Sequence, residues 1–212
     1  MLRSLLRNDN NKFYVDVGCN HPFRDNNSIL FYSMGWRGIN IDANSDVIRT
    51  FNKLRPTDKN VNCGVSDEDG TMSFYMFQNS SVNTFSKRNM ENNIAYGGKL
   101  ENTIQVNVRS LESILRDNIT PGQQISFLTI DVEGFDLKVL RSNNWQIYRP
   151  KIVLVEINDV ECTEIIKNEI GNFMLTQSYI PYAKTINNWL FVDETKFTKK
   201  PGSNHWFQDD QH

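Results

Sequence analysis

Short apolar runs alternate with helix-like segments along most of this 212-residue chain, and that alternation constrains the fold more than any other feature. Near-continuous apolar runs are typical of strands that are buried on both faces of a sheet. Such strands, separated by helices, indicate an α/β fold with a mostly parallel sheet and helices on both faces. The pattern predicts main strands at 13–17, 38–41, 60–65, 124–130 and 151–155, and helices at 28–34, 45–54, 136–142 and 160–173.

The remaining segments extend this arrangement without adding a second domain. Residues 103–108 alternate between apolar and polar side chains, so we expect this strand to pair with residues 71–77. Composition also predicts a closing hairpin at 179–185 and 189–193, a polar surface loop or lid at 78–102, and a polar tail at 196–212. We therefore expect one domain over residues 1–212, with its core at about 13–193.

Composition argues against several classes of protein. No apolar run approaches the roughly 20 residues that a membrane-spanning helix needs. The formal net charge is −2, and no basic run exceeds a pair such as Lys199–Lys200, so we expect neither a membrane nor a nucleic-acid partner. Cys19, Cys63 and Cys162 lie far apart without metal-binding spacing, which indicates reduced thiols and a cytoplasmic location.

Carboxylates mark the ends of several predicted strands. Asp42, Asp131 and Glu156 each follow a strand directly, and Asp16 lies within the first one. Ligands of open parallel sheets bind outside the carboxyl ends of the strands. A single acid in such a place often caps the next helix, but four at equivalent places favour a shared site.

The first predicted turn, Asp16-Val17-Gly18-Cys19-Asn20-His21-Pro22, keeps only one glycine of the dinucleotide-binding pattern GxGxxG. The missing glycines are those that let a pyrophosphate approach the backbone, which disfavours a nicotinamide oxidoreductase. Asp42 lies 24 residues after Gly18, near the spacing at which an acid accepts hydrogen bonds from both ribose hydroxyls. Together these features favour a ligand with adenosine but no phosphate, namely S-adenosylmethionine.

Five segments, read in order, resemble the FkbM family of S-adenosylmethionine-dependent methyltransferases. They are FYVDVGCNHP, GWRGINIDAN, NTFS, ISFLTIDVEGFDLKVL and RPKIVLVEI, and the resemblance extends over about Phe13–Asp193. The first turn of the family commonly reads DxGANxG. Here Cys19 replaces the alanine and Pro22 stands where the last glycine would be, whereas Asp16, Gly18 and Asn20 are kept.

The resemblance implies a class I methyltransferase fold, which is Rossmann-like, with a central, mostly parallel sheet and an antiparallel C-terminal strand. It also implies a role for each matching residue. Asp16, Gly18 and Asn20 would line the methionine end of the cofactor, Asp42 would hold the ribose, Asn44 would lie beside the adenosine, Ser66 and Asp67 would contact the adenine, and Asp131 would lie near the methionine amino group or the transfer site.

Methyl transfer to a hydroxyl benefits from a base that removes the proton of the acceptor. The candidate catalytic residues are Glu133, Asp131, His21 and Glu156. Glu133 is the first choice because Gly134 permits a sharp turn at the mouth of the crevice. Structural roles are equally open: His21 could bond its own turn, Glu133 could cap the next helix, and Glu156 could anchor a backbone amide.

A divalent metal is the alternative to purely acid–base chemistry. Asp131, Glu156, Asn158 and Asp159 offer oxygen ligands from two adjacent strand ends, which would suit Mg²⁺. Acids at the mouth of a cofactor site are also common without a metal. The sequence therefore leaves metal dependence open.

The resemblance implies an O-methyltransferase that acts on a hydroxyl of a sugar, in a glycan or a glycosylated small molecule. One alternative is a different acceptor, such as a nitrogen or an RNA ribose, although RNA fits poorly with the absence of a basic run. A second alternative is a catalytically inactive cofactor-binding or scaffold protein, which Pro22 in the first turn motivates.

Overall fold

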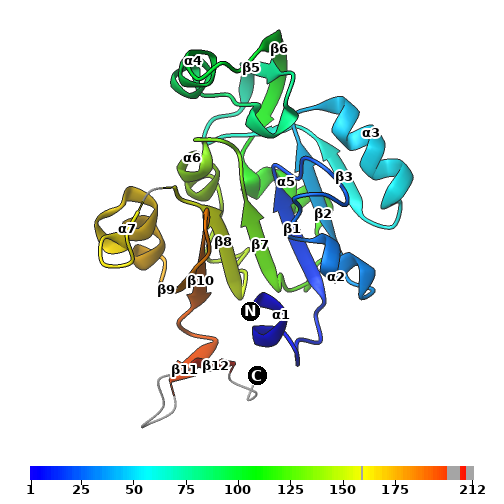
Figure 1. Ribbon diagram of the computed structural model, residues 1–212. Coiled ribbons are helices and arrows are strands. Elements are labelled where there is room, and N and C mark those ends of the chain that lie inside the picture. Colours follow the sequence, from blue (N-terminus) through cyan, green and yellow to red (C-terminus); the bar gives the residue numbers. More distant parts are fainter. Residues whose placement is uncertain (159, 200–205, 209–212) are drawn as a thin grey trace.

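Seven strands form one sheet in the order β3-β2-β1-β7-β8-β10-β9 in the computed structural model (Figure 1), which describes residues 1–158, 160–199 and 206–208. The strands are β1 (Phe13–Val17), β2 (Arg37–Asp42), β3 (Lys59–Asn62), β7 (Phe127–Ile130), β8 (Ile152–Glu156), β9 (Tyr179–Lys184) and β10 (Asn188–Asp193). Strands β1, β2, β3, β7 and β8 run parallel, and β10 runs antiparallel to β8 and β9. The predicted fold class and the closing hairpin are thus confirmed.

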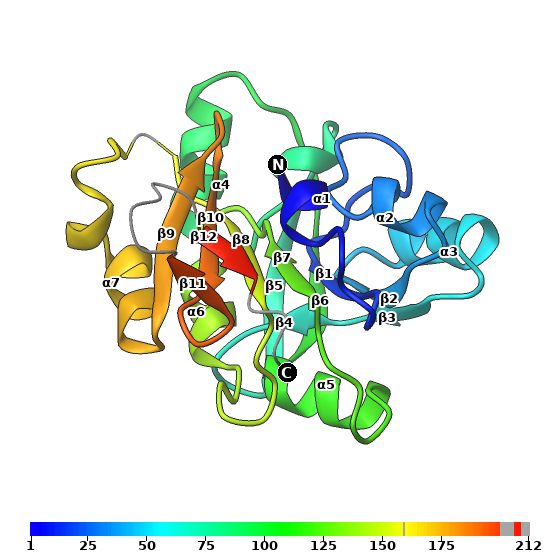
Figure 2. The ribbon, with the colours of Figure 1, turned by 90° about the horizontal axis from the view of Figure 1, so that it is seen from below.

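Helices cover both faces of this sheet. They are α1 (Leu2–Leu5), α2 (Ile29–Ser33), α3 (Ser45–Leu54), α5 (Leu111–Asn118), α6 (Asp136–Arg141) and α7 (Glu169–Thr176), with a short 3₁₀ turn η2 (Ile165–Lys167) before α7. Val15 and its neighbours on one face pack with α5, α6 and α7, whereas Tyr14 and Phe127 on the other face pack with α1 and α2 (Figure 2). Because alternate strand residues point to opposite faces, the buried strands β1, β7 and β8 are apolar at almost every position.

A second, three-stranded sheet stands beyond one end of the main sheet (Figure 1). Its strands are β4 (Gly64–Val65), β6 (Leu100–Arg109) and β5 (Gly70–Phe77), with the turn η1 (Ser80–Val82) and helix α4 (Lys87–Ala95) between β5 and β6. The predicted pairing of residues 71–77 with 103–108 is confirmed, with Thr71 opposite Asn107.

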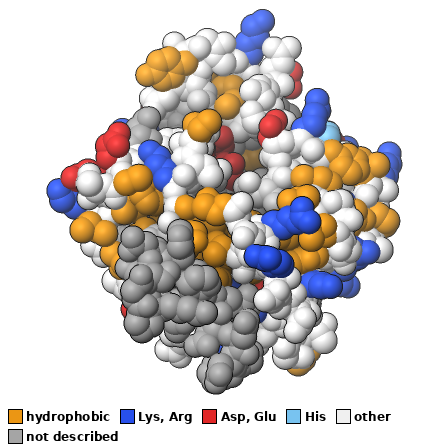
Figure 3. Space-filling view, turned by 60° about the horizontal axis from the view of Figure 1, so that its bottom comes forward, with side chains coloured by type: hydrophobic (Ala, Val, Ile, Leu, Met, Phe, Trp, Pro, Cys, Tyr) orange, Lys and Arg blue, Asp and Glu red, His pale blue; other side chains and the backbone are white. Residues whose placement is uncertain are grey.

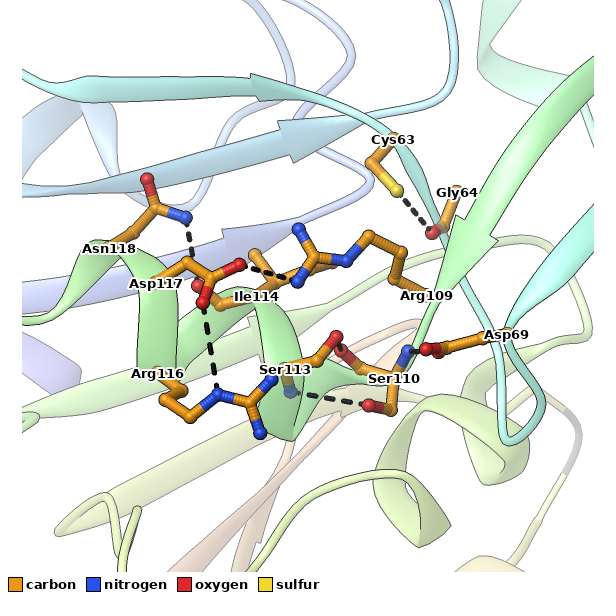
Figure 4. A network of polar contacts seen from close by, with 10 residues as sticks. All are labelled: Cys63, Gly64, Asp69, Arg109, Ser110, Ser113, Ile114, Arg116, Asp117 and Asn118. Carbon is orange, nitrogen blue, oxygen red and sulfur yellow. Dashed lines mark hydrogen bonds and ion pairs between the residues drawn. The ribbon is translucent and has the colours of Figure 1, made fainter.

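Polar contacts fix this small sheet to the start of α5 (Figure 4). Asp69 accepts a hydrogen bond from the Ser110 amide at 2.8 Å, and the Ser110 hydroxyl accepts one from the Ser113 amide at 3.2 Å. The Arg109 guanidinium lies 2.6 Å from the Asp117 carboxylate. These contacts cap α5 and hold β6 against the main body of the protein.

Three predictions need correction. The strand expected at 60–65 divides at Cys63, because β3 pairs with β2 while β4 pairs with β6. The helix expected at 160–173 is replaced by η2 and α7, since Asn168 caps α7 by accepting hydrogen bonds from the Ile170 and Gly171 amides. The region expected to be a polar tail contains a strand pair, β11 (Phe197–Lys199) and β12 (Trp206–Gln208), and Phe197 is fully buried.

No helix within the described ranges is both long enough and apolar enough to span a membrane.

Candidate active site

The carboxyl ends of four parallel strands lie in register. Val17 of β1 pairs with Ile41 of β2 and with Ile130 of β7, and Ile130 pairs with Val155 of β8. The next residue of each strand therefore reaches the same edge of the sheet: Gly18, Asp42, Asp131 and Glu156. This alignment is the physical reason that acids far apart in the sequence form one site.

A cavity of about 270 Å³ opens at this edge, between the main sheet and the small sheet. Six of the predicted site residues line it: Gly18, Asn20, Asp42, Asp131, Glu133 and Glu156. Beside the end of β2 its walls also include Ala43 and Val47, and the small sheet and the segment that follows β5 add Val65, Phe74 and Phe85. The cavity thus joins an apolar region beside Asp42 to a carboxylate cluster at β7 and β8.

Asp42 orders the two loops on either side of it. Its Oδ2 accepts a hydrogen bond from the Asn20 amide at 3.0 Å, and its Oδ1 accepts one from the Asn44 amide at 2.8 Å. Burial raises the pKa of Asp42 to about 6, although these two hydrogen bonds act to lower it. The carboxylate remains in the cavity wall, where lone pairs not used by the backbone can accept from a ligand.

The turn after β1 approaches β7 so closely that Gly18 leaves no room for a side chain. Gly18 has a φ of +78°, and a Cβ there would lie 1.9 Å from the Asp131 carbonyl oxygen. Asn20 follows with a φ of +48°, and its side-chain oxygen accepts a hydrogen bond from the Ser80 hydroxyl at 3.2 Å. The first turn is therefore held against both the main sheet and η1.

Three carboxylates converge at the ends of β7 and β8. One oxygen each from Asp131, Glu133 and Glu156 lies within 4.8 Å of the others. None of the three forms an ion pair within the described part of the chain. Burial, followed by the charge of Glu156, raises the pKa of Asp131 well above its usual range. The same two causes raise the pKa of Glu133 to about 7.

The turn that carries Glu133 has an uncommon backbone. Glu133 has a φ of +52° and Gly134 a φ of +92°, so the chain reverses sharply after β7. The Asp136 carboxylate accepts hydrogen bonds from the Val132 amide at 3.3 Å and the Gly134 amide at 3.1 Å. Asp136 thus satisfies the turn, and the Glu133 carboxylate remains in the cavity wall.

The predicted lid residues 78–102 hold this turn from the opposite side. The Glu133 carbonyl oxygen accepts hydrogen bonds from the Thr84 hydroxyl at 2.8 Å and from the Asn89 side-chain amide at 2.7 Å. Phe85 packs between Phe74 and Phe135, with ring centroids at 4.7 Å and 5.7 Å. The segment Asn83-Thr84-Phe85-Ser86 therefore connects the small sheet to the carboxylate cluster.

Five predicted site residues do not line this cavity. Asp16 is buried behind it and accepts hydrogen bonds from the Ser28 hydroxyl at 2.6 Å and the Asn26 amide at 3.1 Å. The His21 Nδ1 accepts hydrogen bonds from the Phe23 and Arg24 amides, both at 3.1 Å, so His21 bonds its own turn. Hydrogen bonds already made by their side chains explain both placements.

The three residues expected near adenosine also make local contacts. Asn44 caps α3 by accepting a hydrogen bond from the Asp46 amide at 2.9 Å. The Ser66 hydroxyl donates to Asp67 at 3.2 Å, and Asp67 lies 3.3 Å from the Lys138 ammonium. Cys63, Gly64 and Val65 line the cavity in their place, because β4 turns away from β3 at this point.

Sequence reasoning missed several further lining residues: Asp25, Ala43, Cys63, Gly64, Ser80, Ser81, Val132 and Asn187. Ala43, Gly64 and Val132 lie one or two positions from a residue that was chosen, so a wider window around each strand end would have included these three. Asn187 lies at the tip of the β9–β10 hairpin, and its carbonyl accepts a hydrogen bond from the Ile157 amide at 2.9 Å. No sequence motif indicated that this tip reaches the site.

Two ligands fit this donor set. An acid at the end of β2 and an apolar wall suit the ribose and adenine of S-adenosylmethionine, and unpaired carboxylates at β7 and β8 suit its sulfonium and ammonium charges. Asp131, Glu133 and Glu156 also offer one oxygen each to a divalent cation. For the metal alternative, Glu133 therefore accompanies Asp131 and Glu156, while Asp159 lies outside the described residues.

Comparison with known proteins agrees with the motifs read from the sequence. The protein-family model of the methyltransferase FkbM domain matches residues 16–190 of this chain. No curated protein matches. Among solved structures, the crystal structure of methyltransferase FkbM from Methylobacillus flagellatus KT is similar, with 14% identity and a TM-score of 0.49. The match covers 84% of this chain but 42% of that one, so this chain spans less than half of that protein.

The family match includes the strand ends, the carboxylate cluster and the small sheet that encloses the cavity. It confirms the resemblance drawn from the five sequence segments. The chain belongs to the FkbM methyltransferase family.

Proposed function

We propose that this protein transfers a methyl group from S-adenosylmethionine to a hydroxyl of a sugar, in a glycan or a glycosylated small molecule. Membership of the family implies methyl transfer. The observation that carries the finer proposal is the lining of the cavity. It contains Asp42 together with the cluster of Asp131, Glu133 and Glu156, which form no ion pair within the described chain.

The two ends of the cavity suit the two ends of this cofactor. Asp42 would accept hydrogen bonds from the ribose hydroxyls, with the adenine against Ala43, Val47 and Val65. Asp131 would face the ammonium or sulfonium charge, which also relieves the mutual repulsion of the carboxylates. When bound, S-adenosylmethionine supplies an activated methyl group, and the protein contributes its position and a dry environment.

Glu133 is the proposed base. Its carboxyl has a pKa of about 7, so near neutral pH a large fraction is ionised and able to accept a proton. In the proposed step the acceptor hydroxyl would give its proton to the Glu133 carboxylate as its oxygen attacks the methyl carbon in line. The sulfur–methyl bond would break opposite the new oxygen–carbon bond, and neutral S-adenosylhomocysteine would leave. Burial, followed by the charges of Glu156 and Asp136, keeps the pKa of Glu133 raised. Asp131 and Glu156 line the cavity in which the cationic donor would bind.

A hydroxyl acceptor suits this base better than the alternatives do. A basic nitrogen can lose its proton to water before it reacts, so a nitrogen acceptor would not need a carboxylate of raised pKa as its base. An RNA ribose would require phosphate contacts, and on the face drawn in Figure 3 the Lys and Arg side chains lie in several separate places. A scaffold without catalysis would not need a carboxylate in the left-handed conformation of Glu133.

Methyl transfer from labelled S-adenosylmethionine to a library of neutral glycans tests this proposal. We expect incorporation into alkali-stable ethers, and a loss of roughly 100-fold or more in Glu133→Gln, the range of a lost general base. Glu101→Gln, at an exposed position of β6, is the matched control and should retain activity. Label on nitrogen or RNA, or full activity of Glu133→Gln, would contradict the proposal.

A further inference from the structure

A second, larger cavity adjoins the carboxylate cluster from outside. Its volume is about 650 Å³, and it lies between α4, the turn before α6, and the start of α7. It shares Glu133 and Glu156 with the first cavity. Its lining also includes Arg88, Asn89, Leu137, Asn168, Glu169 and Ile170. We call this second cavity the outer groove.

We propose that the outer groove binds the methyl acceptor and selects an uncharged polyhydroxyl group over an anionic one. This inference rests on the proposed function, because it assumes that the first cavity holds the cofactor. Glu133 and Glu156 form the boundary between the two cavities. A hydroxyl that enters from the outer groove would therefore meet the proposed base before it meets the methyl donor.

The charges around the outer groove argue for the exclusion of anions. Glu133, Glu156 and Glu169 contribute carboxylates, and Arg88 is the one basic side chain among the lining residues that the structure describes. Asp136 adds a further carboxylate, although its oxygens accept from the turn amides. A carboxylate or phosphate on the acceptor would lie close to these like charges, which is unfavourable in a partly enclosed space.

The uncharged lining suits a sugar. The amides of Asn89, Asn158 and Asn168 lie in the wall, and each amide can both donate and accept. Asn89 uses an N–H on the Glu133 carbonyl and Asn168 uses its oxygen to cap α7, so both keep polar atoms for a ligand. Leu137 and Ile170 add apolar surface against which the C–H face of a sugar ring can pack.

Binding of two matched probes tests both the place and the charge preference. Saturation-transfer NMR would be recorded with phenyl β-glucoside, which is neutral, and with phenyl β-glucuronide, which carries a carboxylate, in the presence of S-adenosylhomocysteine. We expect saturation of the glucoside and none of the glucuronide. Ile170→Trp fills the outer groove and should abolish the glucoside signal, whereas Leu175→Trp, at an exposed position of α7 outside the lining, should retain it.

Calorimetry with S-adenosylhomocysteine on the same variants separates the two proposals. Ile170→Trp should bind it like the unmodified protein, because Ile170 does not line the first cavity. If Ile170→Trp does not fold, Leu137→Trp replaces it. A glucoside signal that persists in Ile170→Trp would overturn the outer groove as the acceptor site. A signal from the glucuronide alone would overturn the preference for uncharged groups. No signal from either probe would overturn the polyhydroxyl acceptor class. Failure of all variants to bind S-adenosylhomocysteine would overturn the proposed function itself.

Discussion

Removal of the two side chains that hold the Glu133 carbonyl should destabilise the protein more than additively. Thr84 and Asn89 both donate to this oxygen, at 2.8 Å and 2.7 Å. Thr84→Val or Asn89→Ala removes one hydrogen bond and leaves the carbonyl with the other donor, so each should cost about 1 kcal/mol of unfolding free energy. Thr84→Val also removes an acceptor for the Ser86 amide, so its cost should be the larger.

The double variant leaves this carbonyl without a protein donor within the described chain. An unpartnered carbonyl in a partly buried place costs roughly 1–3 kcal/mol, and the left-handed backbone of Glu133 costs about 1–2 kcal/mol that the two donors no longer offset. We therefore expect the double variant to lose about 1 kcal/mol more than the sum of the single losses.

Urea unfolding followed by circular dichroism measures this coupling. The series comprises the unmodified protein, both single variants, the double variant and Asn92→Ala, an exposed control on α4. Repeating it with saturating S-adenosylmethionine should enlarge the coupling, because the ligand requires the ordered turn. Additive losses within about 0.5 kcal/mol, with or without ligand, would refute the role assigned to these two donors.

Two further perturbations have definite expected outcomes. Gly18→Ala should lose cofactor binding and destabilise the fold, because the added Cβ would lie 1.9 Å from the Asp131 carbonyl oxygen. Gly35→Ala is the control, because Gly35 has a similar φ of +88° but open space around it, so this variant measures the backbone cost alone. Equal unfolding free energies of the two variants would refute the argument. Burial and Glu156 raise the Glu133 pKa from 4.5 to about 7, so its contribution to stability is present below about pH 4.5 and is lost as the pH rises through about 7. In Glu133→Gln the fall in unfolding free energy between about pH 5 and pH 8 should therefore be smaller than in the unmodified protein, and an unchanged slope would show that Glu133 does not titrate in this range.

The sequence was most informative about the main sheet and the strand ends. Apolar runs with a fixed length and a terminal acid predict buried parallel strands, and the register of such strands brings Asp42, Asp131 and Glu156 to one edge. The apolar run and the acid that ends it are both local features of the sequence, so they can be recognised without knowledge of the tertiary structure. Glu133 could be chosen for the same reason, since the following Gly134 marks a sharp turn.

Apart from the pairing of residues 71–77 with 103–108, the contacts between distant segments were not predicted from the sequence. Asp16 follows the family pattern, yet the Ser28 hydroxyl and the Asn26 side-chain amide donate hydrogen bonds to its carboxylate. Nothing in the spacing of these residues along the sequence indicates these two bonds. The small sheet takes residues 64–65 away from β3 because Gly64 pairs with Val108, far along the chain. The Thr84 and Asn89 bonds to Glu133 likewise join segments more than forty residues apart.

Calorimetric titration with S-adenosylmethionine and S-adenosylhomocysteine tests the central claim most directly, with NAD as the comparison ligand. The unmodified protein and the exposed control Asp46→Ala should bind both compounds in the micromolar range and NAD not at all, whereas Asp42→Ala, with an unchanged circular dichroism spectrum, should lose binding. Folded protein that binds neither compound, or Asp42→Ala that binds as tightly as the unmodified chain, would contradict the assignment of this cavity to the methyl donor.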